Sequence, residues 1–215
     1  MRETLWRVLD FFGDMVLIHV LWVVSSLPIF TIGASTTALY YTAMKRVHKD
    51  RGTVFSNFKH SFKQNFKQST IYWLILIAAA VILAFDLSYT IKLKTPLGRA
   101  MFAFYVFILI IWWMLWLYIF PVQAKFESTL FGNIKNALIL AIRHLPFTLL
   151  LTVIQAVMLL IVVIFPPFTG LMVTCGAGAL SCLTSLIYVH IFLIYTHEDD
   201  GEDDPDALSS PPPTE

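Results

Sequence analysis

The chain has 215 residues, of which 58% are hydrophobic and 13% are charged, and its net charge is +1. This composition excludes an ordinary soluble domain, and apolar blocks of roughly 20 residues have the length needed to cross a hydrocarbon core of about 30 Å. The short alternating segments of a membrane β-barrel are missing. We therefore expect an all-α fold, a polytopic bundle of transmembrane helices.

Five apolar runs predict five spans within a transmembrane domain of residues 1–196. They lie at about residues 11–32, 71–91, 101–120, 145–165 and 170–195. In the first run, Pro28 removes an intrahelical hydrogen bond, which predicts a kink or a helix end. Residues 197–215 hold eight acids, four prolines and no aromatic residue, which predicts a disordered acidic tail.

Three shorter segments predict amphipathic helices at the inner membrane surface, at about residues 34–48, 53–67 and 129–143. At about 100° per residue, the second segment forms a phenylalanine stripe with a lysine border. The stripe is Phe55, Phe58, Phe62 and Phe66, and the border is Lys59, Lys63 and Lys67. This pattern favours a helix that buries its rings among acyl chains and extends its lysines to anionic headgroups. The alternative is a docking face for a soluble partner.

The second and third of these segments predict an internal repeat. Residues 53–59 read Thr-Val-Phe-Ser-Asn-Phe-Lys and residues 129–135 read Thr-Leu-Phe-Gly-Asn-Ile-Lys, so Thr, Phe, Asn and Lys coincide. An apolar run follows each copy. The interpretation is two parallel units related by an axis along the membrane normal.

Basic residues predict how the chain is threaded. Seven Lys and Arg follow the first span, against the single acid Asp50, and three lie between the third and fourth spans. If both stretches are cytoplasmic, ten basic residues are inside and five outside. The prediction is a multi-pass protein of the bacterial plasma membrane with the N-terminus out and the C-terminus in.

Asp14 and His19 are the candidate intramembrane polar site, because ionisable residues inside a span usually face a bundle interior or a cavity. Asp14 lies only about one turn inside the span, so outer headgroups are an alternative partner for it. A second feature is a face of small residues, which allows close helix packing within the chain or between chains. This face consists of Gly178, Ser181, Cys182 and Ser185. No spacing indicates catalytic, metal or cofactor sites, so we expect no enzyme, no metal and no cofactor.

Several motifs together resemble the YesL-like family of bacterial integral membrane proteins of unknown function. They are Leu27-Pro-Ile-Phe-Thr-Ile-Gly33, Thr37-Ala-Leu-Tyr-Tyr41 and Phe62-Lys-Gln-Asn-Phe-Lys-Gln-Ser69. The resemblance covers roughly the first 75 residues and departs from the family pattern at His19 and Ala34. It implies an association with carbohydrate transport or utilisation.

Two functions stay open at this point. The first is an accessory or regulatory component that docks transporter subunits, or a second copy of the chain, on its basic helices. The second is a small channel or secondary carrier that acts alone and uses Asp14, His19 and the helix broken at Pro28. Both place the protein in contact with the lipid bilayer, and neither involves nucleic acid.

Overall fold

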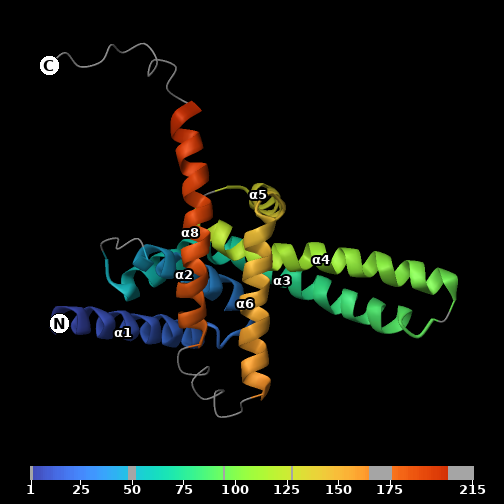
Figure 1. The fold of residues 1–215 in the computed structure, drawn as a ribbon, viewed down its shortest axis with the longest axis horizontal. Coiled ribbons are helices and arrows are strands. Elements are labelled where there is room, and N and C mark those ends of the chain that lie inside the picture. The colour runs from blue at the N-terminus through green and yellow to red at the C-terminus, as the bar shows by residue number, and fades with distance from the viewer. Residues whose placement is uncertain (1, 48–51, 94, 127, 165–175, 203–215) are drawn as a thin grey trace.

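A computed structural model gives the arrangement of the chain shown in Figure 1. It describes residues 2–47, 52–93, 95–126, 128–164 and 176–202, and within these ranges all regular elements are helices. They are α1 (Arg2–Ser25), the short 3-10 helix η1 (Ile29–Thr31), α2 (Ile32–Val47), α3 (Val54–Thr90), α4 (Pro96–Lys125), α5 (Leu130–Arg143), α6 (Leu145–Ile164) and α8 (Ala177–Glu202). The predicted all-α fold is confirmed.

The helices α3 and α4 form a long antiparallel hairpin that projects from the rest of the molecule (Figure 1). Its outer surface is apolar: Val81 is 64% exposed, Phe85 73% and Phe104 60%. An apolar surface of this kind is costly in water and is stable against acyl chains. Within the described residues, α3, α4 and α6 are long and apolar enough to cross a membrane, so the chain is a membrane protein and five spans remain a prediction.

The short helix α2 lies at the centre of the fold and contacts α1, α3, α4 and α8. Its buried residues are mostly small, as in the run from Gly33 to Ala38. Small side chains let neighbouring backbones approach, and a Cβ on Gly33 would overlap the carbonyl oxygen of Ser69 and lie 2.6 Å from Trp73 Cβ. The hydroxyls of Thr37 and Ser69 are hydrogen-bonded at 2.8 Å across the same contact. The segment predicted to lie at the membrane surface is therefore enclosed by other helices.

Threonines begin three of the helices. The side chains of Thr53, Thr95 and Thr129 accept hydrogen bonds from backbone N–H groups three residues ahead, at 3.1–3.3 Å. Such N-caps satisfy donors that a helix leaves unpaired at its start. Thr53 and Thr129 are the equivalent first residues of the predicted repeat, so both copies start a helix in the same way.

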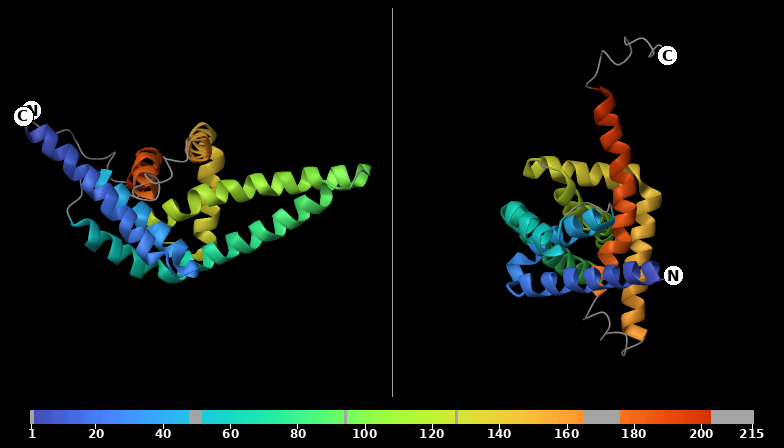
Figure 2. Two further views of the ribbon diagram at one scale, coloured as in Figure 1. Left: turned by 90° about the horizontal axis from the view of Figure 1, so that it is seen from below. Right: turned by 90° about the vertical axis from the view of Figure 1, so that its left-hand side faces the viewer.

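The two copies then differ. Residues 53–67 and the second predicted span form the single helix α3, because no proline or glycine interrupts the chain between them. Figure 2 shows that α3 bends between its first and second halves. In the second copy, α5 ends at Arg143, and His144 has non-helical backbone angles of −111° and 46°.

The first helix ends at Ser25, which agrees with the helix end predicted near Pro28. Two other helix ends differ from the prediction. Helix α4 continues through Pro121 to Lys125. Helix α8 continues to Glu202, although residues 197–202 were predicted to begin the disordered tail. Extending an existing helix requires no new nucleus, which explains why these acidic residues stay helical. Residues 170–175 of the fifth predicted span and 203–215 of the tail lie outside the described residues.

The helices do not share one direction. Helices α6 and α8 run across the α3–α4 hairpin in both Figure 1 and Figure 2. His144 separates α6 from α5, and α5 lies against the inner part of α4. The angle between the hairpin and α6 is therefore set at this junction.

Candidate functional site

The predicted polar residue Asp14 pairs with Arg46. Asp14 lies in the middle of α1, Arg46 lies in the last turn of α2, and their side chains are 21% and 37% exposed. A partly buried ion pair of this kind fixes the relative position of its two helices more than it adds free energy of folding. Asp14 therefore has a structural partner that the sequence analysis did not assign.

This ion pair bears on the predicted threading. The prediction placed Asp14 near the outer end of the first span and the basic end of α2 at the inner surface. A hydrocarbon core of about 30 Å would then separate the two side chains. Their contact instead places the middle of α1 beside the last turn of α2.

His19 lies elsewhere. Its side chain is 4% exposed, and its Nδ1 accepts a hydrogen bond of 3.1 Å from the backbone N–H of Ala177 at the start of α8. The structure thus directs Asp14 toward α2 and His19 toward α8, and it does not bring the two into one site. Each ties α1 to another helix.

The phenylalanine stripe divides into two parts. Phe58 is 5% exposed and belongs to a cluster with Ala38, Leu39 and Ala43 of α2, and Phe62 packs against that cluster. Phe55 is 56% exposed. Phe66 is at the margin of exposure and contacts Phe62 edge-on at 5.5 Å between ring centroids. The stripe is therefore partly a packing face of the protein.

The lysine border keeps its exposure: Lys59, Lys63 and Lys67 are all exposed along α3. Beside Lys67 opens a groove of about 600 Å³, lined by Gln64, Asn65, Lys67, Gln68, Gln123, Ser128 and Thr129. We call these three lysines and the groove the basic docking surface.

The small-residue face packs inside the chain. Gly178, Ser181, Cys182 and Ser185 are all buried. A Cβ on Gly178 would overlap the carbonyl oxygen of Met15 and lie 3.2 Å from His19 Cβ. Of the two alternatives left open by the sequence, packing within the chain is the one that the structure contains.

A cluster of amide side chains at the inner end of the α3–α4 hairpin was missed by the sequence analysis. Gln123 of α4 donates to Asn65 Oδ1 at 2.8 Å and to Gln68 Oε1 at 2.9 Å, and it accepts from Asn133 of α5 at 2.6 Å. Gln123 is 5% exposed and Asn133 0%. Buried amides joined in this way specify one arrangement of three helices. The sequence signal that could have indicated this cluster is the position of these amide residues at the edges of the apolar runs.

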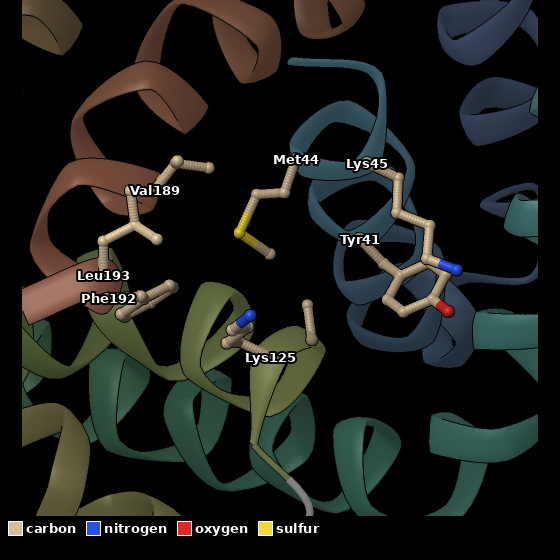
Figure 3. A pocket seen from close by; sticks show the side chains of 8 residues that line it. Tyr41, Met44, Lys45, Lys125, Val189, Phe192 and Leu193 are labelled. Carbon is tan, nitrogen blue, oxygen red and sulfur yellow. The ribbon is translucent and has the colours of Figure 1, made fainter. Parts of the chain in front are cut away.

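A small pocket of about 200 Å³ lies where α2, α4 and α8 meet (Figure 3). Met44, Val189, Phe192 and Leu193 line it with apolar side chains, and two lysines border it, Lys45 at the end of α2 and Lys125 at the end of α4. The ammonium of Lys45 lies 4.9 Å from the centre of the Tyr41 ring, a cation–π contact.

His144 is a titratable group at the α5–α6 junction. Burial lowers its pKa below the usual value, and the nearby positive groups Arg143 and His190 lower it further. The folded protein therefore favours the neutral imidazole at this junction.

These features define an all-helical membrane protein with a cluster of buried amide side chains where α3, α4 and α5 approach one another. A family model described as "Protein of unknown function, DUF624" matches residues 15–87, about a third of the chain. No curated protein and no solved structure matches the chain. The matched region holds α2 with most of α3, the pair that Gly33 brings into close contact.

Proposed function

We propose that this protein is an accessory or regulatory membrane component of a bacterial transport system and has no enzymatic activity of its own. The observation that carries the proposal is the basic docking surface, in which Lys59, Lys63 and Lys67 stay exposed while Phe58 of the same helix is buried. Exposed lysines beside a polar groove fit an acidic cytoplasmic surface of a partner subunit. The YesL-like resemblance adds carbohydrate transport or utilisation as the setting.

The ion pair between Asp14 and Arg46 supports a cytoplasmic N-terminus. Helices α1 and α2 then enter from the cytoplasm and return to it, and α2, with 16 residues, measures about 24 Å. In this threading the N-terminal segment and the first and third loops hold twelve of the 15 Lys and Arg residues, and the loop after α3 holds three. The positive-inside rule favours this division over the ten-to-five division of the first prediction. The C-terminus is also cytoplasmic.

The second candidate, a channel or carrier that acts alone, is supported by the presence of Asp14 and His19 in an apolar helix. Against it, both side chains are engaged in contacts between helices. A permeation role would require these contacts to open during transport.

Co-purification tests the proposal. The tagged protein, extracted from native membranes in mild detergent, should capture transporter subunits. Reversing the charges on the docking surface, with Lys59→Glu, Lys63→Glu and Lys67→Glu together, should abolish the capture. The matched control Lys92→Glu with Arg99→Glu reverses charges on exposed residues at the other end of the hairpin and should retain it. Solute flux in proteoliposomes that contain this protein alone, without captured subunits, would favour the carrier instead.

A further inference from the structure

We propose that the pocket between α2, α4 and α8 binds one anionic phospholipid of the cytoplasmic leaflet, with its phosphate at Lys45 and Lys125. The proposal rests on the membrane location of the chain and on the threading given under the proposed function, and it does not depend on which transport partner the docking surface binds. It assigns a ligand to a pocket that is distinct from the basic docking surface, since the two share no lining residue.

The lining of the pocket has two chemical halves (Figure 3). The apolar half comes from Met44 of α2 and from Val189, Phe192 and Leu193 of α8, and Leu193 is 41% exposed, so this half opens to the surface of the molecule. The polar half consists of Lys45, Lys125 and Tyr41, and Lys45 lies beside the Tyr41 ring. A phospholipid has the same division between acyl chains and a charged headgroup.

Within the residues that the structure describes, the ion pair between a carboxylate and a cation is Asp14–Arg46, and neither Lys45 nor Lys125 takes part in it. The ammonium of Lys45 contacts the face of the Tyr41 ring, and because an ammonium has three N–H donors, donors remain for a phosphate. The helix dipole is an alternative reason for a lysine in the last turn of each helix. It does not explain why the lysines of two different helices border the same apolar pocket.

In the threading proposed above, the pocket lies at the cytoplasmic ends of α2 and α4, where headgroups are found. Lys45 is adjacent in sequence to Arg46, the residue whose ion pair places the end of α2 beside the middle of α1. Lys125 is the last residue of α4, a helix that could cross the membrane. Each lysine near an anionic surface contributes about fivefold in affinity, so two give roughly thirtyfold.

Native mass spectrometry of the full chain in detergent tests this inference, with phosphatidylglycerol and phosphatidylcholine as probes. The wild-type chain should retain one phosphatidylglycerol in preference to phosphatidylcholine. Lys45→Gln with Lys125→Gln should weaken this retention roughly thirtyfold. Lys92→Gln with Arg99→Gln removes the same charge at the other end of the hairpin and should retain the lipid. Lys45→Arg with Lys125→Arg preserves the charge and should also retain it.

Three results would overturn the inference. The first is equal retention by the double glutamine variant and the wild-type chain. The second is equal retention of the two lipids by the wild-type chain. The third is binding of glycerol 3-phosphate as tight as that of the lipid, because the site would then recognise a soluble anion. If loss of the Lys45–Tyr41 contact prevents folding, Lys125→Gln alone, at an exposed side chain, should still weaken retention about fivefold.

Discussion

Gly178 shows how one missing side chain holds two distant helices together. It brings the start of α8 against the backbone of α1 at Met15, next to the hydrogen bond that joins His19 to Ala177. The same α8 face contributes Cys182 to the cluster that contains Ile18 and Phe58. The contact between the first and last helices thus depends on a residue with no Cβ.

Gly178→Ala should therefore destabilise the protein by about 1–3 kcal/mol, because the added methyl group overlaps the Met15 carbonyl oxygen. Gly13→Ala is the matched control, since a Cβ there has no neighbour within 4 Å. In an exposed helix position this change should stabilise by about 0.5–1 kcal/mol. Thermal unfolding in detergent measures both, and equal effects would contradict the close packing at Gly178.

Gln123 is the central residue of the amide cluster, because it bonds to Asn65, Gln68 and Asn133 at once. Gln123→Leu should cost about 1–3 kcal/mol, since it leaves buried amide groups without partners. The same substitution at Gln155, a half-buried residue of α6, is the control and should have a smaller effect. Chemical denaturation compares the two, and an equally stable Gln123→Leu protein would rule out a structural role for the cluster.

At the scale of elements, α3 is joined to α2 by the buried part of the phenylalanine stripe. Phe58→Ala should cost about 3–5 kcal/mol, the usual cost of a buried phenylalanine, whereas Phe55→Ala should change stability little because Phe55 is 56% exposed. Unfolding in detergent gives both values. If Phe55→Ala cost as much as Phe58→Ala, Phe55 would have a partner that this fold does not show.

The junction between α5 and α6 should respond to pH through His144. Because its pKa is lowered in the folded protein, the unfolded chain takes up a proton first as the pH falls below about 6.5. The free energy of unfolding should then decrease between pH 7.5 and the lowered pKa, and His144→Gln should remove that part of the decrease. His60→Gln, at an exposed position of α3, is the control. An unchanged pH profile for His144→Gln would contradict this assignment.

The elements that the sequence predicted well are those determined by local signals. Thr129 and Arg143 bound a helix within one residue of the prediction, and Leu145–Ile164 matches the fourth predicted span. Contacts between distant residues were not predictable in this way. The pairing of Asp14 with Arg46 and the meeting of Asn65, Gln123 and Asn133 depend on how helices cross, and helical periodicity does not contain that information.

At the scale of the whole molecule, the threading is the property most open to test. Single cysteines in a cysteine-free background, at Glu3, Lys63 and Thr95, should react differently with an impermeant reagent added to intact cells. Thr95, at the start of α4, should be labelled, and the other two should react only after the cells are opened. Labelling of position 3 from outside would instead support the external N-terminus predicted from the sequence.

The crossing of the hairpin by α6 limits how the molecule can sit in a bilayer. A helix spans a membrane when it runs roughly along the membrane normal. Because α6 runs across the α3–α4 hairpin, α6 and the hairpin cannot both lie along that normal in this arrangement. If both α4 and α6 span, the angle at His144 must change when the protein enters lipid.

The central position of α2 has a consequence for biosynthesis. This helix is made second, yet it contacts α4 and also α8, the last helix that the structure describes. Its 16 residues are too few for an independent span, and buried residues such as Ala38 and Thr42 have little affinity for acyl chains. The environment of α2 is thus complete only after α8 has been synthesised. Until α8 is made, part of the surface of α2 has no packing partner, and chaperones or membrane proteases can recognise that exposed surface.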